Sequence, residues 1–476
     1  MRPSKGFALV AVLAAVAATD VTTSAHTKRD LGREVLAPND GWASEGTGTT
    51  GGSTAAPEQI YTVTNRRELI AALNNGVPSS TSPSAPSDAP KIIYVVGTID
   101  GNVDDDNNPL TCEDYFRADP TPPAGTTAEI FSYEAFEAAF HPDTWGRTNP
   151  SGPQERARLA SQAAQQARVR IRPGSNTTIV GVGGDATIRG VWLDIRATTA
   201  TPPVQRTNLI IRNITFEDTY DCFPAWAPND GALGAWNSLY DSISLRDTNH
   251  VWVDHNTFRD RTTADETLPL VFGVLFQVHD GLLDITNASD LVTVSWNRFE
   301  NHDKLMLIGS SDNAPADVGK LRVTLHHNLF DGIGQRAPRV RFGQVHIYNN
   351  YYRIDDDDNF QYSWGVGIQS QIYAENNFFE VDRDIALGGI IERLNGTAMF
   401  ETGTLVDHTL RHPFRIPIGR KVSLLEEYNA VTDPDILDAT GTTWIPTFVL
   451  DVDRTWKVPI LVQWGAGPFD RFSAFR

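Results

Sequence analysis

The sequence predicts an all-β fold: a right-handed single-stranded parallel β-helix, or solenoid, with an N-terminal capping helix and long loops. Two observations support this fold class. One eight-residue phrase recurs five times between Val251 and Phe379, and in each copy small or aliphatic residues occupy positions one and three, as in a strand that buries one face. The copies are VWVDHNTF, VTVSWNRF, VTLHHNLF, VHIYNNYY and IYAENNFF.

Each copy also has asparagine at position six and an aromatic residue at position eight. The asparagines are Asn256, Asn297, Asn328, Asn350 and Asn377, at intervals of 41, 31, 22 and 27 residues, and the aromatics are Phe258, Phe299, Phe330, Tyr352 and Phe379. A constant strand with variable connections is typical of a solenoid. We expect the asparagines to adopt the left-handed conformation and stack their amides, with the aromatics stacked inside. The alternative is a β-sandwich in which the phrase recurs by chance.

Other segments fit around this solenoid. Residues 65–76 begin with an asparagine cap, carry glutamate at the third position after it and end in Asn-Gly, which predicts a short helix that closes the N-terminal end. Residues 91–100 and 177–184 are strand-like, and residues 151–170 between them are expected to form a surface helix.

The composition limits the possible partners. The chain has 476 residues, 40% of them hydrophobic, and no linker divides residues 30–476, so we expect one globular domain. Its 59 acidic and 40 basic residues give a net charge of -19, which argues against a nucleic-acid binder or a protein of anionic membrane surfaces. A polyanion would therefore have to meet a local cationic cleft or a metal. Nothing indicates an obligate oligomer, and a monomer is expected.

The N-terminus predicts secretion to the extracellular medium. Residues 1–18 have the layout of a signal peptide, and the pair Lys28-Arg29 predicts a pro-segment over residues 19–29. In an oxidising compartment Cys112 and Cys222 could form a disulfide, although their spacing does not show that they meet. Four sequons are compatible with a glycoprotein: Asn176, Asn213, Asn287 and Asn395.

Four segments carry candidate chemistry. QRAPRVRFG, residues 335–343, places three arginines within six residues of an acidic chain. Carboxylates stand in WNSLYDSISL (Asp241) and HDGLLDIT (Asp280 and Asp284), and NHDKLMLIGSSDN contains Lys304. In this order, with WVDHNTF and the N-terminal NDGWASEGTGTTGG, these segments resemble the calcium-dependent pectate lyases, which are secreted parallel β-helix enzymes. The resemblance extends over nearly the whole chain after the predicted pro-segment.

The resemblance implies a function and a site. Pectate lyases cleave (1→4)-α-D-galacturonan, the polysaccharide of polygalacturonate and pectin, by β-elimination to give 4,5-unsaturated oligogalacturonides. The residues it implies are Asp241, Asp280 and Asp284 for Ca²⁺ with Asp230 as a further metal contact, Arg336 as the base that removes the C5 proton, Lys304 and Arg341 for the substrate carboxylates, and Arg339 in a supporting role. An extended chain would hold Asp280 and Asp284 too far apart for one cation, so we expect a bend at Gly281.

Other interpretations remain open at this point. Histidine is the usual proton-transfer residue near neutral pH, so the histidines beside the motifs are alternative bases: His255, His279, His302, His326 and His327. A pectin lyase acting on methyl-esterified substrate would not need the carboxylates. A polygalacturonase would hydrolyse the same chain with paired carboxylic acids. A catalytically silent β-helix that binds pectin is the alternative from a different functional class.

Overall fold

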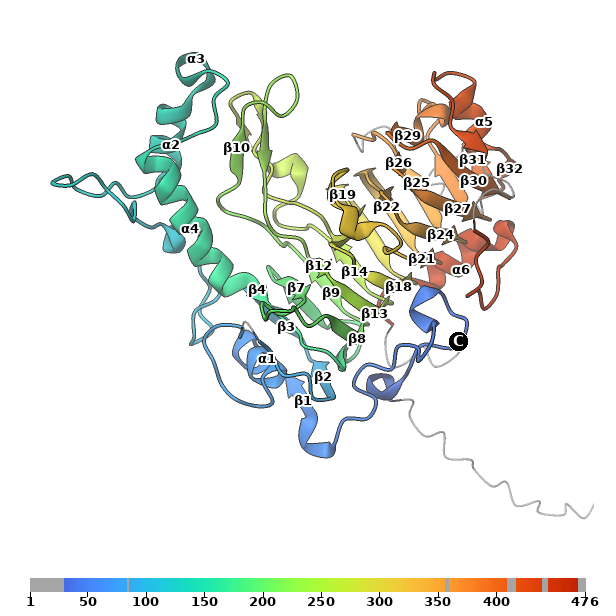
Figure 1. Cartoon of the computed structure of the whole chain (residues 1–476), viewed down its shortest axis with the longest axis horizontal. Coiled ribbons are helices and arrows are strands. Elements are labelled where there is room, and N and C mark those ends of the chain that lie inside the picture. Colours follow the sequence, from blue (N-terminus) through green and yellow to red (C-terminus); the bar gives the residue numbers. More distant parts are fainter. Residues whose placement is uncertain (1–29, 84, 356–358, 409–416, 439–443, 470–476) are drawn as a thin grey trace, which may run out of the picture. The chain divides into compact units, whose positions relative to one another are not determined.

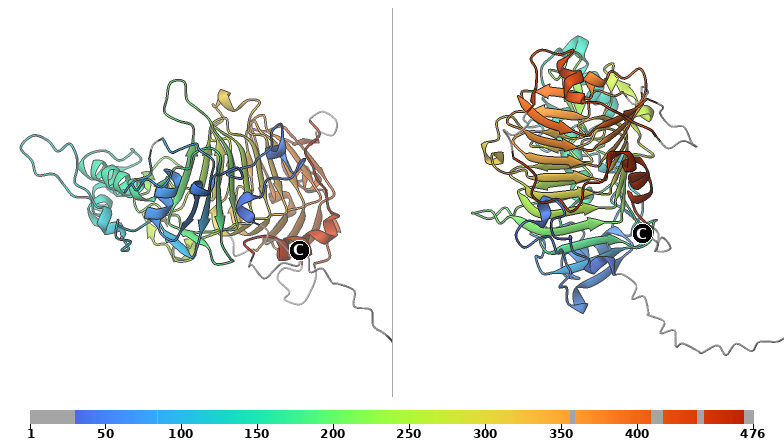
Figure 2. Two further views of the ribbon diagram at one scale, coloured as in Figure 1. Left: turned by 90° about the horizontal axis from the view of Figure 1, so that it is seen from below. Right: turned by 90° about the vertical axis from the view of Figure 1, so that its right-hand side faces the viewer.

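The computed structural model describes residues 30–83, 85–355, 359–408, 417–438 and 444–469. The predicted signal peptide and pro-segment lie outside the described residues. From Gly32 onward the described residues belong to one compact unit. Within it, the strands stack in successive coils to form a parallel β-helix (Figure 1), and Figure 2 shows the strands of successive coils lying side by side. The predicted fold class is confirmed.

Three sheets form the walls of the solenoid. We call them sheets A, B and C, with 11, 10 and 8 strands. Sheet A contains β1 (Ile60–Val63), β2 (Lys91–Val95), β5 (Thr177–Gly181), β8 (Arg206–Arg212), β13 (Thr248–Asp254), β18 (Asp290–Ser295), β21 (Val323–His326), β24 (Gln344–Tyr348), β27 (Gln371–Glu375), β30 (Ala398–Thr402) and β33 (Leu437–Asp438).

Sheet B contains β3 (Thr98–Asp100), β6 (Thr187–Arg189), β9 (Thr215–Glu217), β14 (Thr257–Arg259), β19 (Arg298–Lys304), β22 (Leu329–Gln335), β25 (Tyr351–Ile354), β28 (Phe378–Val381), β31 (Leu405–Asp407) and β32 (Arg420–Lys421). Sheet C contains β4 (Arg170–Ile171), β7 (Trp192–Arg196), β12 (Ile243–Arg246), β17 (Leu283–Thr286), β20 (Leu307–Ile308), β23 (Arg339–Val340), β26 (Trp364–Gly367) and β29 (Ile391–Leu394). Neighbouring strands are parallel in all three sheets except the antiparallel pair β31–β32.

The predicted asparagine ladder is present inside the turn between sheets A and B. Its members are fully buried. Asn297, Asn328, Asn350 and Asn377 each accept a hydrogen bond at Oδ1 from the backbone N–H of the asparagine one coil earlier, at 2.9–3.0 Å, and Asn256 accepts from the Ile214 backbone N–H at 3.1 Å. The aromatics stack beside it with ring centroids 4.3–5.4 Å apart. Phe216 extends this stack by one coil beyond the recognised repeats.

One detail of the prediction was wrong. The left-handed residue of each turn is not the ladder asparagine at position six but the residue before it, at position five. These residues are His255, Trp296, His327, Asn349 and Asn376, with φ of 51–55°. The turn occurs one residue earlier because the position-six side chain must point inward to reach its neighbours.

The helices lie outside the coils. Helix α1 (Arg66–Leu73) forms where expected, with the Asn65 side chain accepting from the Glu68 backbone N–H, and its Leu69, Ile70 and Leu73 join the central core. Figure 1 shows α1 beside β1 and β2. The other helices are α2 (Tyr133–Phe140), α3 (Pro142–Trp145), α4 (Pro153–Val169), α5 (Leu424–Asn429) and α6 (Val458–Gly465). None of the described helices is both long and apolar enough to span a membrane.

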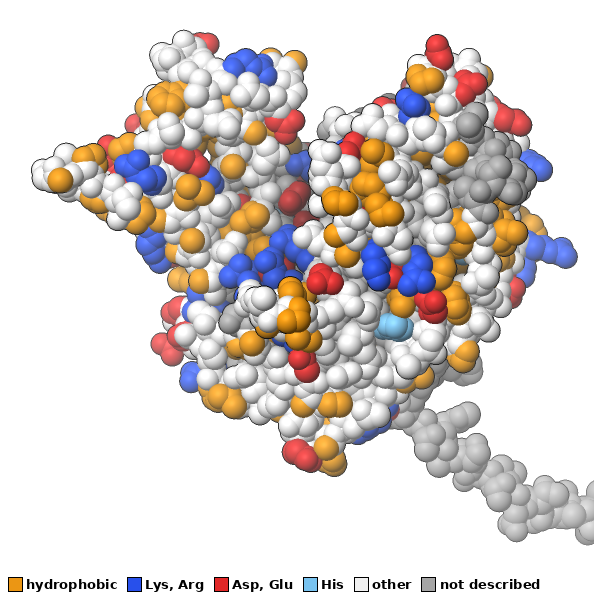
Figure 3. Space-filling view, in the orientation of Figure 1, with side chains coloured by type: hydrophobic (Ala, Val, Ile, Leu, Met, Phe, Trp, Pro, Cys, Tyr) orange, Lys and Arg blue, Asp and Glu red, His pale blue; other side chains and the backbone are white. Residues whose placement is uncertain are grey.

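A second apolar cluster, which we call the aromatic lobe, is built from the long loops. It includes Tyr115, Phe131, Phe136, Phe140, Phe223, Trp226 and Trp236. Helix α2 supplies Phe136 and Phe140, the hairpin of β10 (Ala225–Ala227) and β11 (Ala235–Asn237) supplies Trp226 and Trp236, and the other three come from the segments around them. A smaller hairpin, β15 (Leu270–Val271) with β16 (Val274–Leu275), packs against it. Figure 3 shows a hollow between this lobe and the C-terminal coils.

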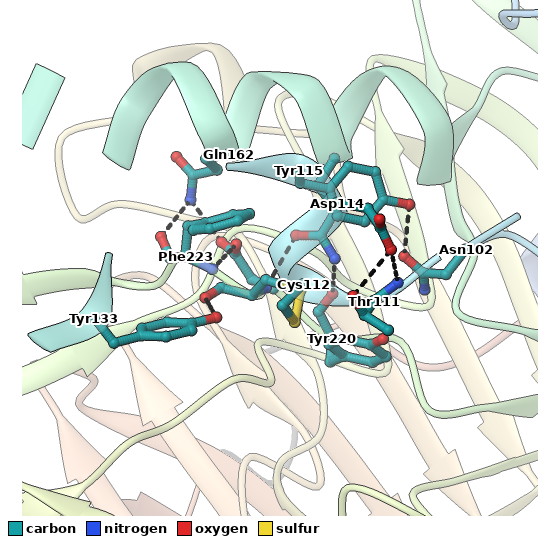
Figure 4. Close-up of a disulfide and its surroundings, with 12 residues drawn as sticks. Asn102, Thr111, Cys112, Asp114, Tyr115, Tyr133, Gln162, Tyr220 and Phe223 are labelled. Carbon is teal, nitrogen blue, oxygen red and sulfur yellow. Dashed lines mark hydrogen bonds between the residues drawn. A yellow bond between two sulfur atoms is a disulfide. The ribbon is translucent and has the colours of Figure 1, made fainter. Parts of the chain in front are cut away.

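A disulfide ties the aromatic lobe together. Cys112 and Cys222, whose pairing the sequence left open, are bonded across 110 residues of chain. The Tyr133 hydroxyl donates to the Cys222 carbonyl at 2.9 Å, and Asp114 and Thr111 form a capping box at the start of the short helix that carries Cys112 (Figure 4). The bond therefore links the segment before α2 to the segment between β9 and β10 within the aromatic lobe.

The predicted sequons differ in accessibility. Asn213 is fully buried, and its side chain donates to the carbonyls of Gly181 and Gly183, so the folded chain has no room for a glycan there. Asn287 and Asn395 are exposed. Of these two, Asn395 donates to Asp312 at 2.8 Å.

Candidate active site

Except for Asp230, the residues that the sequence selected come from neighbouring strands of sheets B and C. They stand within these strands or next to their ends: Asp241 before β12, Asp280 before β17, Asp284 within β17, Lys304 at the end of β19, Arg336 between β22 and β23, and Arg341 after β23. Because β12 pairs with β17 and β17 with β20, these residues belong to successive coils.

Two carboxylates approach each other at Gly281. A Cβ atom added to Gly281 would lie 2.6 Å from Oδ1 of Asp284 and 3.1 Å from Oδ1 of Asp241. The Gly281 backbone N–H donates to Oδ1 of Asp241 at 3.0 Å, and the Leu307 backbone N–H donates to Oδ1 of Asp284 at 2.9 Å. Glycine is therefore needed here for the close approach of the carboxylates, because a side chain would displace them.

The proximity of the carboxylates shows in their proton affinities. Burial raises the pKa of Asp241 well above its usual value, and the charges of Asp284 and Asp280 raise it further. Burial also raises the pKa of Asp284 to about 7, with Asp280 adding to the rise. The guanidiniums of Arg336 and Arg246 act in the opposite direction on Asp284 but do not outweigh these effects. The three carboxylates thus form a region where negative charge is poorly compensated by the protein itself.

The backbone of Asp280 is held by a buried histidine. Nε2 of His302 lies 2.8 Å from the Asp280 carbonyl oxygen, and its Nδ1 lies 2.5 Å from Oδ2 of Asp260. Burial alone would lower the pKa of His302, but the Asp260 carboxylate outweighs it and raises the pKa to about 9. A protonated ring donates from both nitrogens, so it can bind the carboxylate and the carbonyl at once.

Arg336 occupies a strained backbone position at this site. Its φ is 62°, in the left-handed region, which costs a non-glycine residue about 1 kcal/mol or more. Its carbonyl accepts from the Met306 backbone N–H at 2.9 Å, and its Nε is buried without a hydrogen-bond partner. The fold thus keeps a guanidinium nitrogen out of solvent while leaving it unbonded.

Tyr362 lies against this arginine, and the sequence analysis did not predict it as a site residue. Its side chain is 6% exposed. Burial raises the pKa of the hydroxyl, while the charges of Arg336 and Arg339 and a hydrogen bond with Arg336 act to lower it. No local motif signals Tyr362, since it comes from a different coil.

Lys304 stands one coil before Arg336. The two residues are adjacent because Lys304 pairs with Gln335 across β19 and β22. Its side chain is half-buried, and among the described residues no carboxylate forms an ion pair with its ammonium group. Lys304 therefore offers an uncommitted positive charge beside the carboxylate region.

Arg341, in contrast, is already engaged. It is 7% exposed, its Nε donates to Oδ1 of Asp312 at 2.6 Å, and its Nη1 donates to the Gly309 carbonyl at 2.8 Å. The Arg341 hydrogen bond is the main reason why the pKa of Asp312 is lowered, with the Asn395 amide adding to the effect. A substrate carboxylate would have to compete with Asp312 for this arginine.

Asp230 lies apart from the other predicted metal residues. It is exposed in the loop between β10 and β11, where its carboxylate is 3.5 Å from the Asn237 side-chain amide. No hydrogen bond or ion pair of the described residues links it to Asp241, Asp280 or Asp284. Within the described ranges, moreover, no group of three or more acidic, histidine or cysteine side chains is closed around a metal position. The carboxylate region is therefore open rather than a complete protein cage.

The five histidines beside the motifs contact other groups of the protein. His279 contacts the carbonyls of Thr219 and Thr263 with its two ring nitrogens, and His302 is held as described above. The others belong to the turns of sheet A: His255 contacts Asp254, and the rings of His326 and His327 contact each other. None of these five rings has an arrangement suited to removing a proton from a substrate in the hollow.

Comparisons with known proteins agree with this geometry. Residues 149–411 match a family model described as pectate lyase. A pectate lyase of Bacillus subtilis (strain 168) is 43% identical over 452 residues, covering 94% of this chain and 96% of the relative. Pectate lyase E of Dickeya dadantii (strain 3937) is 34% identical over 410 residues, with 84% and 83% covered.

Solved structures give the same result. A thermostable pectate lyase is 46% identical with a TM-score of 0.82, covering 93% of this chain and 100% of its own. A pectate lyase bound to a hexasaccharide is 39% identical with a TM-score of 0.79, covering 92% and 99%. From its sequence, its parallel β-helix and these relatives, the chain belongs to the pectate lyase family.

Proposed function

We propose that this pectate lyase is secreted and cleaves polygalacturonate by calcium-assisted β-elimination, which yields 4,5-unsaturated oligogalacturonides. The observation that supports this most strongly is the meeting of the Asp241 and Asp284 carboxylates at Gly281, where burial and neighbouring carboxylates raise both pKa values while the guanidinium of Arg336 opposes the rise at Asp284. The related enzyme bound to a hexasaccharide supports an oligosaccharide substrate.

Asp241, Asp280 and Asp284 are the proposed ligands of Ca²⁺. They offer only oxygen atoms, and a divalent cation would relieve the repulsion that raises the pKa of Asp241 and Asp284. The open arrangement also leaves positions for a substrate carboxylate. When bound, Ca²⁺ would neutralise the uronate carboxylate beside C5 and make the C5 proton more acidic. Asp230 would join only if the loop between β10 and β11 moved toward the others.

Arg336 is the proposed base. It takes the C5 proton, the electrons of that C–H bond form the C4=C5 double bond, and the C4–O bond breaks to release the other part of the chain without addition of water. Arginine normally keeps its proton, but several guanidinium groups lie close together here. Burial lowers the pKa of the neighbouring Arg339, and the charges of Arg341 and Arg336 lower it further. Such repulsion between like charges favours the loss of a proton from the group. We therefore expect activity to rise in alkaline solution.

Lys304 and Arg341 are the proposed contacts for uronate carboxylates. Lys304 is uncommitted, whereas Arg341 must exchange Asp312 for the substrate. Both would hold the chain so that C5 faces Arg336, and both would place positive charge where negative charge develops. Arg339, next to them on β23, would support this field without touching the reacting atoms.

We further propose that residues 30–476 act as a single monomeric domain after removal of residues 1–18 and 19–29. Arg2 and Lys5 before the apolar run, and the dibasic pair Lys28-Arg29 after it, support this processing. Sequencing the N-terminus of protein recovered from culture medium tests both cleavage sites, and size-exclusion chromatography with light scattering tests the monomer.

The decisive experiment follows unsaturated product by its ultraviolet absorbance on polygalacturonate, with added Ca²⁺ and with a chelator. Wild-type enzyme should form product only with Ca²⁺. Arg336→Lys should lose about 10²–10⁴-fold in turnover while substrate affinity changes far less, because a lysine keeps the charge but not the geometry.

Two comparisons sharpen this test. Arg339→Lys is the matched control and should keep most of the turnover, whereas Lys304→Ala and Arg341→Ala should lose affinity as well as rate. Substantial turnover in Arg336→Lys would place the proton acceptor elsewhere. Saturated reducing ends without absorbance would mean hydrolysis rather than elimination.

A further inference from the structure

Sheet C carries a second group of charges that the proposed catalytic site does not use. Leu193, Ile195 and Leu245 point into the core, so the alternate residues of β7 and β12 face outward. Among the outward residues and their neighbours are four arginines, which we call the arginine patch: Arg170, Arg172, Arg196 and Arg246. Figure 3 shows Lys and Arg side chains gathered in the hollow where Figure 1 places β4, β7 and β12.

The patch is held in place by buried groups. Asp194, fully buried, lies 2.7 Å from Nε of Arg196 and 3.4 Å from Nε of Arg172. The Trp192 ring, also buried, packs under Arg246 and Arg170, whose guanidinium carbons lie 5.2 and 5.9 Å from the ring centroid. The arginines are thus fixed in position rather than free in solvent.

The patch has an excess of positive charge. Asp194 is shared by two arginines. Among the residues that the structure describes, Arg246 forms an ion pair only with Asp241, at 3.9 Å, a carboxylate already proposed as a ligand of the cation. Arg170 forms no ion pair with any described residue and donates instead to the Gln166 side chain at 2.8 Å. Burial lowers the pKa of Arg170, and the charges of Arg172 and Arg196 lower it further. An anion would relieve this repulsion.

The patch is also accessible and continuous with the proposed catalytic site. The side chains of Arg172, Arg196 and Arg246 remain 15%, 31% and 29% exposed. Arg246 lies directly beside Arg196 across β7 and β12, and the next strand of the sheet, β17, carries Asp284. The arginines therefore follow the coils of sheet C away from the carboxylates, at the strand spacing of about 4.8 Å.

We propose that the arginine patch binds further uronate residues of the same galacturonan chain, on the N-terminal side of the carboxylates, and so sets a preference for long, unesterified substrate. This inference rests on the proposed function. A 1,4-linked galacturonan places one carboxylate on each sugar and advances by a length comparable to one strand spacing, so successive carboxylates can meet successive coils. Guanidinium groups favour such planar carboxylates because they donate two parallel hydrogen bonds.

The test compares Arg196→Gln and Arg170→Gln with wild type on purified oligogalacturonates of increasing length, starting from the shortest that wild type cleaves. Arg170→Gln is included because Arg170 supports no buried carboxylate, so its loss should not disturb the fold. Arg259→Gln, on the outer face of sheet B where Arg259 pairs with Glu217 at 3.0 Å, is the matched control.

We expect kcat/KM of both patch variants to fall about tenfold on long oligomers and polygalacturonate, mainly through KM, and to stay at the wild-type value on the shortest substrate. The difference should shrink as methyl esterification of pectin increases, because esterification removes the charge. A loss of equal size at every length, or no loss at any length, would overturn the proposal. Absence of elimination by the wild type would instead contradict the proposed function itself.

Discussion

Replacing Asn328 by leucine tests the asparagine ladder that holds the coils together. Asn328 is fully buried in the middle of the ladder. Its Oδ1 accepts from the backbone N–H of Asn297 at 2.9 Å and from the Asn297 side chain at 3.1 Å. Its Nδ2 donates to the Val294 carbonyl at 2.9 Å and to Oδ1 of Asn350 at 3.0 Å. Leucine has a similar size and removes all four interactions without creating a large cavity.

The expected loss follows from which groups are left without partners. The Asn297 backbone N–H has no other acceptor in the ladder, and an unsatisfied buried group costs about 1–3 kcal/mol. The Asn297 side-chain amide keeps one acceptor, because its Nδ2 also donates to the Val253 carbonyl at 2.9 Å. We therefore expect Asn328→Leu to lose roughly 2–5 kcal/mol of unfolding free energy in total.

Urea unfolding followed by tryptophan fluorescence measures this loss, with initial rates on polygalacturonate as the second measurement. The rate per folded molecule should change little, since the ladder is not part of the hollow. Asn149→Leu, at an exposed loop position, is the control and should unfold like wild type. An unfolding midpoint of Asn328→Leu equal to that of wild type would refute the ladder's energetic role.

The remaining predictions concern the carboxylates and their arginines. Asp284→Asn should raise the Ca²⁺ concentration needed for activity at an unchanged fold, and unchanged calcium dependence would remove Asp284 from the site. In metal-free enzyme, the pKa of Asp284 is raised to about 7, whereas the carboxyl in the unfolded chain releases its proton at about pH 4. The free energy of unfolding should therefore fall as pH rises from about 4 through 7. Melting temperatures measured across this pH range should fall less for Asp284→Asn than for wild type. Asp312→Asn should lower KM severalfold by removing the carboxylate that competes for Arg341, which stays anchored by the Gly309 carbonyl; a raised KM would mean that Asp312 positions the arginine instead.

The repeated phrase predicted the solenoid because both of its marked positions serve contacts between coils. Asparagine and the aromatic residue recur since each must match the same residue in the next coil. The turn residue could not be placed as easily, because its side chain lies outside the ladder and varies. At that position Trp296 and His327 stack with ring centroids 4.3 Å apart, a contact that helps to offset the low preference of tryptophan for the left-handed conformation.

The residues of the candidate site could be predicted only in part from the sequence, for a related reason. Asp280, Gly281 and Asp284 stand close in sequence, so their proximity could be expected from one motif. Arg341 and Asp312 are 29 residues apart, and nothing local indicates that the arginine has a carboxylate partner before substrate arrives. Tyr362 comes from yet another coil. Contacts between coils depend on the register of the sheets, which the varying connection lengths conceal.

The same geometry explains how a chain with net charge -19 can present a cationic groove. Arg172, Arg196 and Arg246 are separated by 24 and 50 residues, and only Arg172 stands in a basic stretch of sequence, RVRIR at residues 168–172. Parallel coils align residues that occupy the same phase, whatever the length of the loops between them. Arginines from three successive coils, on the same face of sheet C, are then enough to form a row. Net composition therefore excludes a broadly basic surface but not a narrow track of positive charge, and a polyuronate, whose carboxylates repeat along a line, matches such a track better than a polyanion that needs a wide basic face.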